Sequence, residues 1–187
     1  MSLFADELPP GLLYFPNWLT ESEEDALLRE IDGRDFDHTL SRRVQHYGAR
    51  YDYRAGEIKG IGSAPPIPPE LLAVAERLVS EGIFRTSVDQ VIINEYVGDQ
   101  GIAPHIDSQG FGDAVATVSL LETWPMEFVS PDGSSLKVLL DRRSLAVMTG
   151  PARYEWTHSI PKRKTTEQGG IRITRGRRLS VTLRTLN

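Results

Sequence analysis

The chain has 187 residues, a formal net charge of -5 and no cysteine. This length fits one domain with a single core, and the lack of thiols excludes disulfides, thiolate zinc sites and cysteine nucleophiles, so metal ligands must be histidine, carboxylate or carbonyl groups. The acidic balance argues against a wholly electropositive nucleic-acid binder, although basic residues gather in two segments, 38–54 and 161–178.

The N-terminal stretch MSLFADELPP has no basic region followed by an apolar run, and no later window reaches the length of a membrane span. We therefore expect a soluble, cytoplasmic protein with no membrane association. No obligate protein partner is evident in the sequence.

Two helices are predicted in the first part of the chain. Thr20 and Glu23 match the capping-box pattern, and the apolar spacing of EEDALLREI predicts a helix from about Ser22 to Asp32. A second helix is predicted over PPELLAVAERLVSEG, residues 68–82, because proline stands at its start and Gly82 at its end.

After residue 86 the pattern changes to short strands. Six segments are rich in β-branched residues and are separated by turn sequences such as SPDGSS and MTGPA. They are SVDQVIINEYV, AVATVSLL, MEFVSP, SLKVLL, SLAVMT and RLSVTLRTL. Several short strands without intervening helices favour a sandwich, barrel or jelly roll.

The stretch QGIAPHIDSQ contains His105 and Asp107 one residue apart. In an extended chain these two side chains project to the same face, where they can bind one metal ion. A third ligand would be His38, His46 or His158, and His158 is favoured because it ends an apolar, strand-like segment. Two histidines and one carboxylate form the facial triad of non-haem Fe(II) oxygenases. The alternative is a hydrogen-bonded pair on the surface.

Two of the predicted strands carry polar side chains on one face. These are Asn94 and Tyr96 on one strand, and Arg178, Ser180, Thr182 and Arg184 on the other. Arginines on the inward face of a β-domain need carboxylates, and a bound dicarboxylate would serve. Alternatively, this is the solvated face of an outer strand.

Taken together, these residues resemble the AlkB-type family of Fe(II)- and 2-oxoglutarate-dependent oxygenases. The resemblance covers roughly residues 40–187 through the ordered motifs N-x-Y, H-x-D, a later H, and R-x5-R. It implies an α+β fold and a single domain over 1–187. Helices and a substrate lid would occupy residues 1–85, and residues 86–187 would form a double-stranded β-helix (jelly-roll) core with the helices packed outside it.

The resemblance also implies Fe(II), 2-oxoglutarate and O2 as the reacting groups. By this resemblance His105, Asp107 and His158 hold the iron, and Arg178 pairs with the distal carboxylate of 2-oxoglutarate. The remaining cosubstrate residues are Asn94, Tyr96, Ser180, Thr182 and Arg184, with Arg184 near the keto-acid end. The sequences of two segments, QGIAPHID and RRSLAVMTGPARYEWTH, are most similar to those of the branch that hydroxylates modified wobble uridine in transfer RNA.

Substrate contacts are expected in the lid segment RRVQHYGARYDYRAGE, which mixes arginines with aromatic residues. Arginine side chains would contact phosphates and aromatic rings would stack on a flipped base. The candidates are Arg42, Arg43, Arg50 and Arg54 for phosphates, and His46, Tyr47, Tyr51 and Tyr53 for stacking. The alternative is an exposed basic hairpin whose tyrosines pack on the core.

Gln109 marks a departure from the family pattern. Members that demethylate adenine or cytosine often have a carboxylate two residues beyond the metal aspartate. An amide both donates and accepts, so it also tolerates a uracil-like or guanine-like edge.

We therefore predict a dioxygenase that hydroxylates or demethylates a modified or alkylated nucleobase in DNA or RNA, as in DNA repair or tRNA modification. One alternative is the same chemistry on a protein side chain. The other is a catalytically inactive β-helix that only binds nucleic acid or protein.

Overall fold

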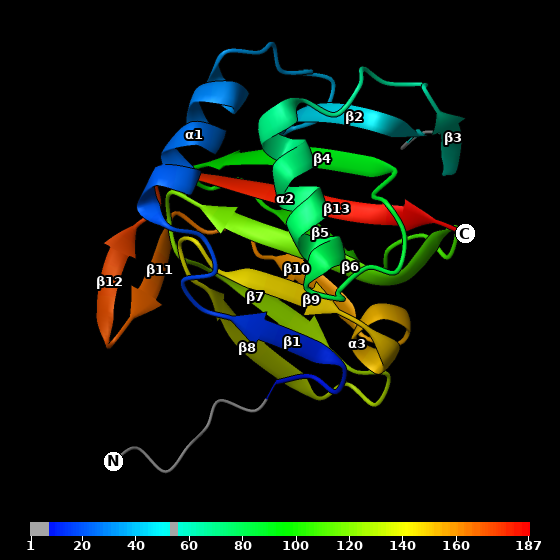
Figure 1. Cartoon of the computed structure of the whole chain (residues 1–187). Helices are drawn as coiled ribbons and strands as arrows, with labels where there is room; N and C mark the ends of the chain where they lie inside the picture. The colour runs from blue at the N-terminus through cyan, green and yellow to red at the C-terminus, as the bar shows by residue number, and fades with distance from the viewer. Residues whose placement is uncertain (1–7, 53–55) are drawn as a thin grey trace.

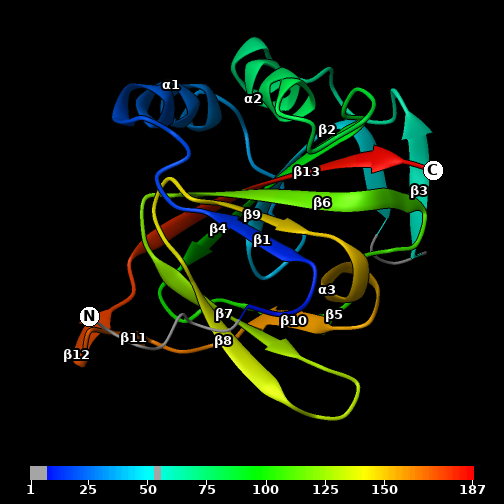
Figure 2. The same cartoon turned by 60° about the horizontal axis from the view of Figure 1, so that its bottom comes forward.

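The computed structural model describes residues 8–52 and 56–187, and it consists of two packed β-sheets with helices on one side (Figures 1 and 2). In order across the larger sheet, the strands are β1 (Leu12–Phe15), β9 (Leu145–Met148), β6 (Phe111–Leu120), β13 (Arg177–Leu186), β4 (Gln90–Val97), β2 (Arg43–Asp52) and β3 (Glu57–Ile61). The smaller sheet contains β5 (Ile102–His105), β10 (Thr157–Ile160), β7 (Trp124–Val129) and β8 (Ser135–Leu140). A separate hairpin pairs β11 (Thr165–Gln168) with β12 (Ile171–Thr174).

Two helices, α1 (Glu21–Asp32) and α2 (Pro69–Ser80), cover the outer face of the larger sheet (Figure 2). The capping box at Thr20 and Glu23 forms as the sequence predicts. A third, short helix is α3 (Gly150–Tyr154). Among the described residues, no helix combines the length and the apolar character that crossing a bilayer requires.

The two faces of the larger sheet differ in chemistry, and β13 at its centre shows this most clearly. Leu179, Val181 and Leu183 belong to the apolar core that the sheet shares with α1 and α2. Arg178 and Ser180 alternate with them and are also buried, so they point toward the smaller sheet. The polar face is therefore interior, and the alternative of a solvated outer face does not hold.

The segment 38–54 corrects one expectation. Most of it forms β2, which pairs with β4 from Arg43 opposite Glu95 to Gly48 opposite Gln90. The larger sheet thus contains three strands from before residue 86, namely β1, β2 and β3, and the expected division between a lid region and a β core at that residue does not match the sheet. The alternation on β2 is hard to read in the sequence because polar residues occur on both of its faces.

Candidate metal and cosubstrate site

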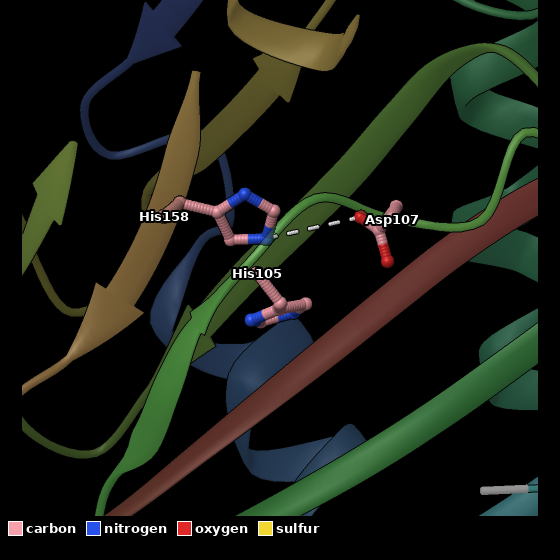
Figure 3. Close-up of side chains that lie close together, drawn as sticks. All are labelled: His105, Asp107 and His158. Carbon is pink, nitrogen blue, oxygen red and sulfur yellow. Dashed lines mark ion pairs between the residues drawn. The ribbon is translucent and has the colours of Figure 1, made fainter. Parts of the chain in front are cut away.

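His105, Asp107 and His158 come together between the two sheets (Figure 3). His105 ends β5 and His158 lies directly opposite it on β10, so the two imidazole rings have centroids 4.3 Å apart. Asp107 follows two residues after His105, and one possible ligand atom from each of the three residues lies within 4.8 Å of the others. Neither His38 nor His46 joins this group. The structure therefore places His158, the histidine favoured from the sequence, beside His105 and Asp107.

Close pairing of β5 with β10 depends on Gly101, which stands just before β5. A Cβ at this position would overlap the backbone carbonyl of Ile160. Any other residue at position 101 would push apart the two strands on which His105 and His158 lie.

The charges of this group suit a divalent metal. Asp107 is 7% exposed, so burial raises the pKa of its carboxyl, but Arg184 and the two histidines outweigh burial and hold that pKa below its usual range. Burial lowers the pKa of His158 to about 4. A carboxylate and a neutral imidazole are the protonation states that bind metal ions.

Hydrogen bonding leaves ligand atoms available. Nδ1 of His105 donates to the carbonyl oxygen of Ala103 at 2.9 Å, so Nε2 of that ring keeps its lone pair. Oδ1 of Asp107 accepts from Nη2 of Arg184 at 2.6 Å, whereas Oδ2 is buried, has no hydrogen-bond partner among the described residues and lies 3.9 Å from Nε2 of His158. Two nitrogen donors and one unsatisfied carboxylate oxygen fit Fe(II).

The loop that carries Asp107 is fixed by Arg153 of α3, a residue that the sequence analysis missed. Arg153 is buried and donates to the carbonyl oxygens of Asp107 at 2.9 Å and Ser108 at 2.6 Å. It also donates to the carbonyls of Phe111 and Gly112. Its partners are backbone atoms, which leave no signature in a sequence beyond the similarity of the segment that contains Arg153.

The interior face of β4 and β13 continues from the metal group. A cavity of about 40 Å³ is lined by His105, Asp107 and His158 and by the polar residues predicted for the cosubstrate, which are Asn94, Tyr96, Ser180, Thr182 and Arg184.

Arg178 lies at the far end of this face and is 0% exposed. Its Nη2 donates to Oγ of Ser119 at 2.9 Å, but Nε and Nη1 have no hydrogen-bond partner within the described residues. Burial lowers the pKa of Arg178 to about 10. A buried guanidinium with unused donors fits the distal carboxylate of 2-oxoglutarate, which would supply both the charge and the acceptors.

A larger cavity of about 490 Å³ opens beside the metal group. Of the residues expected to contact substrate, Arg42 lines it, and so does Tyr51. Arg42 is nevertheless 8% exposed, and its Nε donates to Oδ1 of Asn94 at 2.8 Å. It is therefore part of the cavity wall, not a surface residue positioned for phosphates. Lys162, from the second basic segment, and Phe111 also line the cavity.

Two of the expected substrate contacts lie on the wrong side of the sheet. Arg43 pairs with the buried Glu95, with Nη2 2.8 Å from Oε1, and stacks on Phe36. Tyr47 is buried in the core shared with the helices, where its hydroxyl donates to Gln45. The side chains of both residues lie on the face of β2 that is turned toward the helices. Neither can therefore contact a base beside the metal group.

The other substrate candidates are placed as follows. His46 lines a separate cavity of about 480 Å³, together with Arg34 and Arg50. Gln109 is exposed and is not among the residues that line the cavity beside the metal group. Tyr53 lies outside the described residues, as does Arg54.

Comparisons with known proteins agree with this geometry. The family model of the 2OG-Fe(II) oxygenase superfamily matches residues 11–184. A mouse protein, tRNA (carboxymethyluridine(34)-5-O)-methyltransferase ALKBH8, is 36% identical over 168 residues, which are 85% of this chain and 25% of that protein. The alkylated DNA repair protein ALKBH8 homolog of Arabidopsis thaliana is 32% identical over 210 residues, covering 98% of this chain and 61% of the relative. The chain thus spans about a quarter of the length of its mouse relative.

The structure of OsALKBH1 has the same fold, with a TM-score of 0.75 at 18% identity, and the match covers 96% of this chain and 98% of that one. This confirms the jelly-roll prediction. Two antiparallel sheets enclosing two histidines and a carboxylate define a jelly-roll oxygenase, and the chain belongs to the 2OG-Fe(II) oxygenase superfamily, among its AlkB-type members. The family consists of dioxygenases that depend on Fe(II), 2-oxoglutarate and O2, and this chain has the two histidines and the carboxylate that such a metal site requires.

Proposed function

We propose that this dioxygenase hydroxylates or demethylates a modified or alkylated nucleobase in RNA or DNA. The observation that carries the proposal is the cavity of about 490 Å³ beside His105 and Asp107. Its wall includes the half-buried ring of Tyr51, which lies 6.1 Å from the ring of the buried Phe111, and the cation of Lys162. Aromatic rings that stack on a base and cations that contact phosphates are the usual elements of a single-strand nucleic-acid site.

In this proposal His105, Asp107 and His158 hold Fe(II). When bound, the iron supplies the oxidation of a substrate C–H bond by O2, coupled to conversion of 2-oxoglutarate to succinate and carbon dioxide. Arg184 holds Oδ1 of Asp107 at 2.6 Å, which directs Oδ2 toward His158. Arg178 fixes the distal carboxylate of 2-oxoglutarate, which orients the cosubstrate.

The protein's remaining task is to position the target carbon. Ile92, Ile102 and Ile106 line the same cavity, and their apolar side chains favour an enclosed base over water. A product hydroxylated on an N-methyl carbon loses formaldehyde, whereas one hydroxylated on another carbon persists as an alcohol. The chain needs no general base for either outcome.

The test is succinate release from 2-oxoglutarate by the iron-loaded protein in the presence of short RNA and DNA oligonucleotides. The set should include modified uridine, N-methylated adenine and N-methylated cytosine, with unmodified oligonucleotides of the same sequence as references. We expect one class of modified oligonucleotide to stimulate succinate release and to be converted in equal amount.

A pair of lysine variants shows whether the cavity is responsible. Lys162→Ala should reduce the stimulation by oligonucleotides, because this lysine lines the cavity. Lys137→Ala is the matched control, because Lys137 is exposed on β8 and does not line the cavity. Stimulation by a peptide and by no oligonucleotide would instead favour the alternative of a protein side chain as substrate.

A further inference from the structure

Arg175 is a second buried arginine with unused donors, and the roles assigned above do not include it. It lies between β12 and β13 and is 3% exposed. Its Nη1 donates to the carbonyl oxygen of Pro161 at 2.7 Å, whereas Nε and Nη2 have no hydrogen-bond partner in the part of the chain that the structure describes. These two nitrogens form one side of the guanidinium, the edge that binds both oxygens of a carboxylate.

Arg175 and Arg178 flank one pair of aromatic rings. The guanidinium carbon of Arg175 lies 4.5 Å from the ring centre of Trp124, and that of Arg178 lies 5.7 Å from the ring centre of Tyr96. The two rings pack at 6.0 Å in a tilted arrangement. Burial is the main cause that lowers the pKa of Arg178, and the positive charge of Arg175 adds to it.

Burial lowers the pKa of Arg175, and the nearby Glu127 and Glu122 offset this only in part. Glu122 accepts from Nε1 of Trp124 at 2.9 Å and from the backbone N–H of Gly176 at 2.8 Å. Glu127 pairs with Arg163 at 3.2 Å. Neither carboxylate forms an ion pair with Arg175 among the described residues. Two buried cations with four unused donor atoms are unfavourable unless an anion joins them.

We propose that Arg175 is a second cation of the cosubstrate pocket and binds the distal carboxylate of 2-oxoglutarate together with Arg178. The inference rests on the proposed role of Arg178. Arg175 offers the two-donor edge formed by Nε and Nη2, whereas the unused Nε and Nη1 of Arg178 lie on opposite sides of its guanidinium and act as single donors. The pocket therefore selects a charged tail, because an uncharged tail leaves two buried cations together.

Binding of two ligands under anaerobic conditions tests this selection. Calorimetric titration of the Fe(II)-loaded protein with 2-oxoglutarate is compared with titration by 2-oxoglutaramate, in which a neutral amide replaces the distal carboxylate. In Arg175→Gln we expect affinity for 2-oxoglutarate to fall at least tenfold, about 1.4 kcal/mol, while affinity for the amide changes by less than about threefold. Arg172→Gln is the matched control, because Arg172 is an exposed arginine on the adjacent β12.

The proposal is overturned if Arg175→Gln leaves the preference for the charged tail unchanged. Equal weakening of both ligands also overturns it, because a residue that only supports Trp124 by packing affects both alike. Arg175→Lys serves if the glutamine variant does not fold, since it keeps the charge without the two-donor edge and should show a smaller loss specific to 2-oxoglutarate. If Arg178→Lys binds 2-oxoglutarate as tightly as the unmodified protein does, the cosubstrate role of Arg178 itself is wrong.

Discussion

Glu95 and Asp107 are both buried carboxylates beside the central strands, and both are held by arginine, but their oxygens are used differently. Glu95 is 1% exposed, and its Oε1 accepts from Arg43 at 2.8 Å and from Arg177 at 2.7 Å. Its Oε2 accepts from Nε of Arg43. Within residues 8–52 and 56–187, Asp107 accepts a hydrogen bond at Oδ1, from Arg184, and has no hydrogen-bond partner at Oδ2.

This difference separates a structural carboxylate from one that is available to a ligand. Glu24, buried in α1, follows the pattern of Glu95, because one oxygen accepts from the backbone N–H of Leu121 at 2.8 Å and the other from Arg142 at 2.7 Å. A buried carboxylate oxygen without a hydrogen-bond partner is unfavourable. The unpartnered Oδ2 of Asp107 therefore indicates a ligand atom for a bound cation.

The largest expected effect comes from removing the carboxylate that is available. Asp107→Ala should bring iron-dependent succinate release below detection, because two histidines alone hold iron weakly and with poor geometry. His105→Ala should do the same. The measurement is succinate release together with Fe(II) affinity, and Glu95→Gln is the control that should remain active. Full activity in Asp107→Ala would show that these residues do not hold the iron.

Neighbouring arginines on β13 extend the comparison to the cosubstrate. Arg178→Lys keeps the charge but loses the planar two-donor edge, so the KM for 2-oxoglutarate should rise at least tenfold, about 1.4 kcal/mol. Arg177→Lys is the control, since Arg177 points to the other side of the strand and pairs with Asp32 and Glu95. If the KM of Arg178→Lys were no higher than that of Arg177→Lys, another residue would bind the distal carboxylate, and Arg184 would be the first candidate.

Glu95→Gln should alter stability and leave the chemistry intact. The amide keeps the shape but loses two charge-assisted pairs, and we expect the free energy of unfolding to fall by about 1 kcal/mol. This value is modest because the side chains of Arg43 and Arg177 are 43% and 33% exposed. Urea unfolding measures the loss, and a KM for 2-oxoglutarate equal to that of the unmodified protein confirms that the site is intact.

The sequence predicts the metal group well because its signal is local. His105 ends β5 and Asp107 follows two residues later, and the alternation of polar and apolar residues on β13 marks one face for Arg178 and Arg184. The two helices are also predictable, since capping residues and apolar spacing lie within each segment.

Partners distant in the chain explain what the sequence could not show. On β2, Arg43 and Gln45 have the composition of a surface segment, yet Arg43 is held by Glu95 and Gln45 donates to the carbonyl of Ile31 at 2.9 Å. Arg153 and Arg175 donate to backbone carbonyls, which every residue type offers equally. The face on which such side chains lie becomes known only with the sheet order.

The smallest expected effect is a pH dependence that belongs to Glu95. Burial raises the pKa of its carboxyl, but the hydrogen bonds and charges of Arg43 and Arg177 outweigh burial and leave that pKa below its ordinary value of 4.5. A carboxyl with a lowered pKa in the folded state contributes stability at pH values above its ordinary pKa, and this contribution is lost as the pH falls through the folded-state value. The difference in unfolding free energy between the unmodified protein and Glu95→Gln should therefore be constant from about pH 7 to pH 5 and shrink below about pH 4. Urea unfolding of both proteins across this range measures it, and a difference that stays constant down to about pH 3 would show that the arginines do not stabilise the ionised carboxylate.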